Sequence, residues 1–306
     1  MSTVSNSVSP VMTRENIRPV AQAFGLLAAA LLVLSILYGL FAWQAVQRER
    51  LGEVAGVATA GARAAGHLLQ SEQQHFAMLA DELAEAGGSA QPEAAERVLQ
   101  RVATMRPGLG RIDFLDAAGR SIAASEPWPS TAATARETAL LAGLAQAREH
   151  EGLQLGPVAW RSADRAWLPV TQRLVDAASG RTYGFVVAQL RIDGAASWHH
   201  LQTPAHVQAG LVSDTGETLI QLAGTADKAR GPFWKWLQDH DRPRQGSVAI
   251  GDTFDIELRH YAFERVDGHR ITAFASVSQA ALLRAWFDRV RVPFLVFALA
   301  LAGLAF

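Results

Sequence analysis

Residues 164–193 read DRAWLPVTQRLVDAASGRTYGFVVAQLRID, and their pattern is that of a β-hairpin. In the first half, Leu168, Val170 and Leu174 fall on one face, which is the period-two alternation of a half-buried strand. Gly180 supplies a turn position that tolerates positive φ, and residues 184–190 return as an apolar strand. A hairpin this apolar needs further strands and helices to cover it, so it marks the centre of a folded domain.

Strand–turn–strand patterns occur on both sides of this hairpin. Residues 110–125, GRIDFLDAAGRSIAAS, predict two strands around an Asp-x-x-Gly turn, and residues 207–221, VQAGLVSDTGETLIQ, predict a second such unit. Residues 253–277 predict two strands that meet at Asp267-Gly268, a strong two-residue hairpin signal. With a single strand expected at residues 153–160, the chain predicts two successive antiparallel sheets.

Helical sequence lies ahead of the strands. Residues 24–43 carry no charge and would extend about 30 Å as a helix, which matches the hydrocarbon core of a bilayer. This run exceeds the roughly 7–15 apolar residues of a cleaved signal peptide, so we expect an uncleaved anchor. Residues 48–85 are rich in Ala, Leu, Glu and Gln without Pro and predict a long helix, and Pro92 opens another that ends near Met105.

The C-terminal end repeats this apolar character. Residues 278–291 predict an amphipathic helix, and residues 292–306 are apolar and uncharged. Fifteen helical residues reach only about 22 Å, which is short of a bilayer core. We therefore expect the sequence to stop inside a second membrane helix.

Composition excludes several classes of function. The net charge of −1 argues against nucleic acid as a partner, and the absence of cysteine excludes disulfides and thiolate chemistry. Adjacent His199 and His200 would point about 100° apart on a helix, so no metal and no cofactor is expected. Asp113 and Asp116 are interpreted as strand-end and turn residues, and no catalytic residues are predicted.

The central hairpin resembles that of the extracytoplasmic Cache domains. The shared features are LPVTQRL at 168–174, a short turn, and the pattern Gly184-x-x-x-Ala188-x-Leu190. Cache domains are PAS-like sensors of bacterial chemoreceptors, histidine kinases and diguanylate cyclases, and two successive units resemble the double Cache arrangement. The resemblance implies a membrane-anchored α+β fold, with a long N-terminal helix and two PAS-like antiparallel-sheet modules between two transmembrane helices.

The same resemblance implies a domain plan and a role. The expected parts are a cytoplasmic tail (1–20), a transmembrane helix (21–43), a long signalling and dimer helix (44–91), a membrane-distal module (92–201), a membrane-proximal module (202–278) and a helix leading into a truncated second transmembrane helix (279–306). The chain would be the ligand-sensing portion of a homodimeric receptor of the bacterial inner membrane, with its sensor in the periplasm. Flanking charges do not decide this orientation. Cysteines placed at Ala58 or Ala65 are expected to lie at the dimer contact.

Arg165-Ala-Trp167 matches an Arg-x-Trp pattern of Cache modules that bind amino acids. There the arginine grips the ligand carboxylate and the aromatic ring covers its body. The resemblance therefore implies a small-molecule site that contains Arg161, Arg165 and Trp167, with Asp193 or Asp164 facing a ligand amine. Leu168 departs from the pattern, which has an aromatic residue there, so amino-acid specificity stays open.

Other readings of the same residues stay open as well. Trp167 could be a core side chain and Arg165 a solvated strand residue. At the level of function, the alternatives are a membrane-anchored scaffold without a ligand and a membrane-anchored extracytoplasmic hydrolase. For the hydrolase, no Ser-His-Asp or carboxylate-plus-metal pattern can be placed in the sequence.

Overall fold

The computed structural model divides the chain into two compact units, Leu51–Gln279 and a unit of Met1–Arg50 with Ala280–Phe306. It describes residues 14–106, 108–126, 143–150, 152–156, 160–162, 165–176, 179–191, 203–214, 216, 218–223, 231–251 and 258–305. The sequence also predicts a helix at 134–149, which the structure describes only from residue 143, and a short helix at 192–201, which lies outside the described residues.

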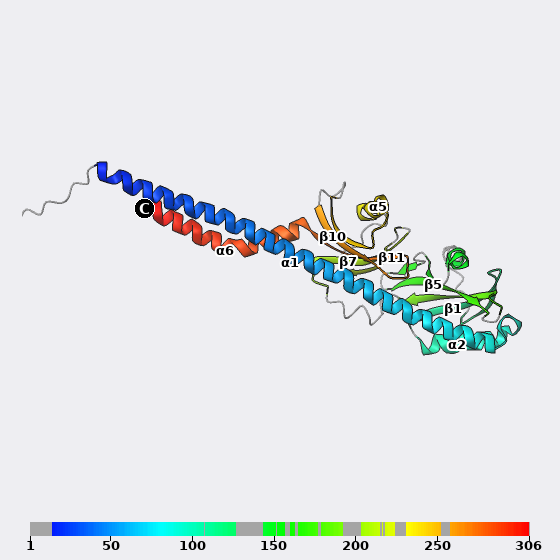
Figure 1. Ribbon diagram of the computed structural model, residues 1–306. Coiled ribbons are helices and arrows are strands. Elements are labelled where there is room, and N and C mark those ends of the chain that lie inside the picture. The colour runs from blue at the N-terminus through cyan, green and yellow to red at the C-terminus, as the bar shows by residue number, and fades with distance from the viewer. Residues whose placement is uncertain are drawn as a thin grey trace, which may run out of the picture. The chain divides into compact units, whose positions relative to one another are not determined.

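One uninterrupted helix, α1 (Arg14–Glu85, 72 residues), contains both the apolar run at 24–43 and the helical stretch predicted at 48–85 (Figure 1). Its segment from Gln22 onward has a window of mean hydropathy 2.4, and among the described residues α1 alone is long and apolar enough to cross a membrane. The helix ends just before Gly87, which adopts the left-handed conformation (φ 92°) that commonly terminates helices. A short 3-10 turn (Gly88–Ala90) then leads to α2 (Pro92–Met105), whose bounds agree with the prediction.

The N-terminal part of α1 packs against α6 (Gln279–Ala305) within one unit (Figure 1). The indole of Trp286 donates a hydrogen bond to the carbonyl of Gly39 over 2.9 Å and packs edge-on against Trp43. A Cβ atom at Gly39 would lie 3.1 Å from the Phe294 ring, so glycine permits this close approach.

The first sheet has six antiparallel strands in the order β2-β1-β6-β5-β3, and β4 also pairs with β5. Its strands are β1 (Leu109–Asp116), β2 (Ser121–Ala124), β3 (Leu153–Leu155), β4 (Trp160–Ser162), β5 (Arg165–Val175) and β6 (Thr182–Arg191). The prediction of one strand over 153–160 was wrong, because β3 and β4 are separate strands that pair with different parts of β5.

The second sheet has five antiparallel strands in the order β8-β7-β11-β10-β9. Its elements are β7 (Val207–Ser213), β8 (Thr218–Ala223), α5 (Pro232–Asp239), β9 (Gln245–Gly251), β10 (Leu258–Arg265) and β11 (Ile271–Ser278). Helix α5 covers one face, where Phe233 stacks on Tyr261 with the ring centroids 4.7 Å apart. The sequence analysis missed β9, since most of its side chains are exposed and only Val248 and Ile250 are half-buried.

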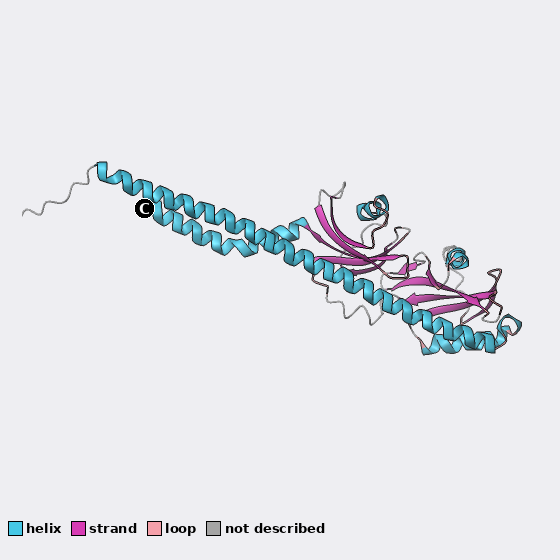
Figure 2. Cartoon of the chain, in the orientation of Figure 1, coloured by secondary structure: helices cyan, strands magenta, loops and turns pink. Residues whose placement is uncertain are grey.

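The main core lies where α1 and α2 pack against the sheets (Figure 2). Leu168, Val170 and Leu174 are all buried there, which confirms the predicted inner face of the hairpin. The two sheets and the long N-terminal helix confirm the α+β class. The bounds assigned to the two modules stay a prediction.

Candidate functional site

The six-stranded sheet has two different faces. Its inner face, which includes Phe114, Val170 and Val186, belongs to the core that contains α1. The opposite side, here called the outer face, carries Arg111, Asp113, Leu115, Thr171, Phe185 and Val187. On it, Leu115, Phe185 and Val187 form a separate small cluster with Leu144 and Ala147 of the helical segment 143–149.

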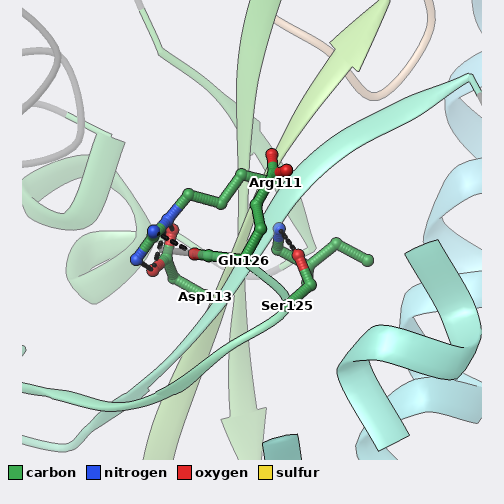
Figure 3. Close-up of polar contacts among 5 residues, drawn as sticks. Arg111, Asp113, Ser125 and Glu126 are labelled. Carbon is green, nitrogen blue, oxygen red and sulfur yellow. Dashed lines mark hydrogen bonds and ion pairs between the residues drawn. The ribbon is translucent and has the colours of Figure 1, made fainter. Parts of the chain in front are cut away.

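A buried ion pair lies on the outer face at β1. Arg111 and Asp113 are two residues apart, so strand alternation places them on the same side. The Nε of Arg111 donates to both carboxylate oxygens of Asp113, at 2.9 and 2.8 Å, and its Nη1 donates to the carbonyl of Glu126 (Figure 3). The two side chains are only 5% and 6% exposed, so this pair is largely withdrawn from water.

The environment of Asp113 opposes its charge. Burial raises the pKa of the Asp113 carboxyl, while the hydrogen bond and the positive charge of Arg111 act to lower it. The net direction is upward because removal of the carboxylate from water outweighs the guanidinium. Ser125 helps to hold the neighbouring backbone, since its hydroxyl accepts from the amide of Ile112 over 2.9 Å (Figure 3).

Thr171 places an unpaired hydroxyl in the middle of the outer face. The residue is fully buried on β5, opposite Val187, and its Oγ1 has no hydrogen-bond partner among the described residues. The segment 143–149 approaches closely here, because a Cβ atom at Gly143 would lie 2.8 Å from that oxygen. A buried hydroxyl normally has a partner, so a bound molecule, a water or a group outside the described residues is expected at this point.

The residues predicted from the sequence lie at the start of β5 and on its neighbour β4. Ser162 pairs with Arg165 and Trp160 with Trp167, while Arg161 pairs with Ala166 and so is one residue out of phase with Arg165. The side chains of Arg161, Arg165 and Trp167, and the whole of Asp193, lie outside the described part of the structure. The structure therefore brings the strands together at this end of the sheet and leaves the side-chain assignment a prediction.

The sequence analysis missed Thr171 as a site residue and took Asp113 for an ordinary strand-end residue. One signal was available for the buried pair: Arg111 and Asp113 carry opposite charges at spacing i, i+2 in an otherwise apolar strand. No comparable signal exists for Thr171, because threonine is common in half-buried strands.

Comparison with known proteins gives likeness in structure only. No protein-family model matches the chain, and no curated protein matches it in sequence. Among solved structures, the extracellular domain of rpHK1S-Z16, named as a histidine kinase, is 20% identical with a TM-score of 0.57, over 78% of this chain and 98% of that one.

Two amino-acid complexes are similar at the same level. The ligand-binding domain of Mlp24 with asparagine is 12% identical with a TM-score of 0.53, over 82% of this chain and 99% of that one. The ligand-binding domain of the amino-acid chemoreceptor PctB of Pseudomonas aeruginosa PAO1, in complex with L-Gln, is 15% identical with a TM-score of 0.52. That match covers 75% of this chain and 91% of the PctB domain.

These likenesses define the class of fold. The chain has the architecture of the extracellular sensor domains of histidine kinases and chemoreceptors, so the prediction of a Cache-type, PAS-like sensor fold is confirmed. At these identities the structures show the fold, and the ligand has to be argued from the residues of this chain.

Proposed function

We propose that this chain is the extracytoplasmic ligand-sensing portion of a bacterial transmembrane signalling receptor. The observation that carries the proposal is the outer face of the six-stranded sheet in a sensor-type fold. A buried ion pair lies there, together with the hydroxyl of Thr171, which has no partner in the described part of the chain. Buried polar groups grouped on one face beside apolar side chains are typical of a small-molecule site.

The proposed ligand is a small carboxylate, such as an amino acid. Arg165 would bind the carboxylate through its planar fork, and Trp167 would cover the body of the ligand. Arg161 and Asp193 would complete the site, with Asp193 facing an amine. The solved complexes of Mlp24 with asparagine and PctB with L-Gln support an amino acid as the first class to test.

Signal would leave the sensor along two continuous connections. α1 runs without a break from the sensor core into the apolar segment, and β11 ends at Ser278 where α6 begins at Gln279. A ligand that binds one conformation of the sheet better than another shifts the population toward that conformation. Both helices would shift with it, because they are continuous with the sensor. The receiver would be a cytoplasmic output domain beyond this sequence.

The remaining parts of the proposal concern the setting. The chain would cross the bacterial inner membrane twice, through α1 and α6, with residues 44–291 in the periplasm, and would form a homodimer along α1. A cysteine at exposed Ser89 should then react with an impermeant reagent in intact spheroplasts. Protection of this cysteine until the membrane is permeabilised would contradict the orientation.

The test of function is a ligand screen on the compact unit 51–279. Thermal-shift measurements against the amino acids and small organic acids should find a ligand that raises the unfolding temperature, as binding to the folded state requires. Absence of any shift would favour the scaffold without a ligand. Conversion of a tested compound to product would favour the hydrolase, whereas the proposed sensor binds its ligand without turnover.

A further inference from the structure

A pocket lies between α1 and α2, on the inner side of the six-stranded sheet. Its volume is about 220 Å³. The lining residues are His75, Phe76, Met78, Leu79 and Glu82 of α1, Val102 and Met105 of α2, Arg106 directly after α2, and Leu109 of β1. Phe76, Leu79 and Leu109 are buried and form its apolar floor. Met78 and Met105 are 55% and 65% exposed and form an adaptable rim.

Two ion pairs join α1 to α2 beside this pocket. Arg106 donates to Glu72 over 2.7 Å, and Arg101 donates to Glu82 over 2.6 Å. The outer pair, Arg101 with Glu82, has side chains that are 56% and 46% exposed, so it contributes little energy. The pair of Arg106 with Glu72 differs, since the Glu72 side chain is only 5% exposed.

The buried pair has hydrogen-bonding capacity left over. Among the described residues, no partner exists for Oε2 of Glu72, Nη1 of Arg106 or Nδ1 of His75. Arg106 and His75 line the pocket, and Glu72 is bonded to Arg106. A buried carboxylate oxygen and a buried guanidinium N–H that lack hydrogen bonds both destabilise the fold. Their presence side by side points to a bound molecule that donates one hydrogen bond and accepts another.

The structure assigns this pocket as a second binding site, for a small uncharged amphipathic molecule with a primary amide or similar head. The amide N–H would donate to Oε2 of Glu72, and the amide oxygen would accept from Nη1 of Arg106. The head of the ligand carries no charge, because each of the two arginines beside the pocket is already paired with a glutamate. An apolar cavity of about 150 Å³ takes benzene, so this pocket accommodates a ring with a one-carbon head.

The site differs from the proposed carboxylate site in position and in chemistry. Its ligand would contact α1 directly on one side and α2 on the other, whereas the outer face is on the far side of the sheet from α1. Failure at one site therefore leaves the other untouched.

The test uses the absence of cysteine from the chain. Met78→Cys and, as a second variant, Met105→Cys place a single thiol on the rim of the pocket in the full chain held in nanodiscs. Ala84→Cys is the matched control, because it is exposed on α1 and does not line the pocket. Maleimide labelling is timed with increasing benzamide, and with toluene as the probe that lacks a polar head.

Benzamide is expected to slow labelling of both rim thiols at least fivefold and to leave the control unchanged. Glu72→Gln should raise the benzamide concentration for half-protection about tenfold, the scale of one hydrogen bond to a charged group. No protection would mean that the pocket holds only water and would overturn the assignment. Equal protection by toluene would also overturn it, because toluene has no polar head. Slow labelling without any probe would overturn it as well, since a second copy of the chain would then cover the rim.

Discussion

Arg111 and Asp113 lie two residues apart on β1, and the guanidinium of Arg111 reaches both carboxylate oxygens of Asp113 in a pair with side chains 5% and 6% exposed. Two opposite charges buried on the outer face of a sheet are expensive to create, and they are much more expensive to separate. The pair therefore makes this part of β1 intolerant of single substitutions.

Asp113→Ala should lower the free energy of unfolding by about 3–5 kcal/mol, because it leaves the Arg111 guanidinium buried without a negative charge to balance it. Denaturant titration of the 51–279 unit measures the change. The double variant Arg111→Met with Asp113→Leu should recover most of the loss, since it removes both charges. A single variant as stable as the parent would show that water reaches Arg111 freely.

Arg165→Ala should weaken binding of the ligand found by the screen about tenfold to a hundredfold, because a hydrogen bond to a charged group contributes about 1.5–3 kcal/mol. Arg165→Lys should fail as well, since an ammonium group lacks the planar fork. Calorimetric titration provides the affinities, and Arg120→Ala serves as the control, because Arg120 is an exposed surface residue that pairs with Asp116. Unchanged affinity in Arg165→Ala would remove this arginine from the site.

Gly184 of β6 pairs with Asp116 at the end of β1. A Cβ atom there would lie 2.4 Å from the backbone oxygen of Leu115 and 2.9 Å from the Phe114 ring. Gly184→Ala should therefore cost about 1–3 kcal/mol of stability through overpacking. Gly108→Ala is the matched control, because its added methyl group meets nothing within 4 Å. Equal denaturation midpoints for the two variants would contradict the close approach of the strands.

His269 should make the 51–279 unit less stable in mild acid. Burial lowers the pKa of His269 below its ordinary value of 6.5. The contribution of the neutral His269 side chain to stability is therefore fully present above pH 6.5. It is lost as the pH falls through the lowered pKa, because the unfolded chain binds the proton more readily than the folded one. His269→Gln should flatten this part of the pH profile of the denaturation midpoint. A profile parallel to that of the parent would assign the pH dependence to other groups.

Dimer contacts along α1 can be tested by disulfide crosslinking in membranes. The expectation that Ala58 or Ala65 lies at the contact was wrong for a simple reason: both are buried inside their own chain, at 2% and 1% exposure. Ala55 is exposed on the same helix. Ala55→Cys should crosslink if α1 helices pair at this position, whereas Ala58→Cys should not. Crosslinking of the buried position alone would contradict the described packing of α1.

Local sequence was enough to predict the inner face of the hairpin, the bounds of α2 and the location of the turn at Asp267-Gly268. The predicted two-residue connection was wrong, because residues 266–270 separate β10 from β11. Alternation of apolar residues along β5 encodes which face is buried, and Pro92 marks a helix start without reference to the rest of the chain. The resemblance of the hairpin to Cache domains was also a property of a short stretch. The solved sensor domains confirm the α+β sensor fold that it implied, and the two transmembrane helices stay a prediction.

Only the tertiary structure decided which polar groups are withdrawn from water. Burial of Arg111, Asp113 and Thr171 depends on what covers the outer face, and the segment 143–149 that packs there is distant in sequence from β1. The burial of Glu72, whose Oε2 has no partner among the residues that the structure describes, likewise results from the packing of α2 onto α1. The physical reason is that hydrophobic periodicity reports the burial of an element's own face. The hydrogen-bond partners of a buried polar atom are set by segments that the chain brings together from a distance.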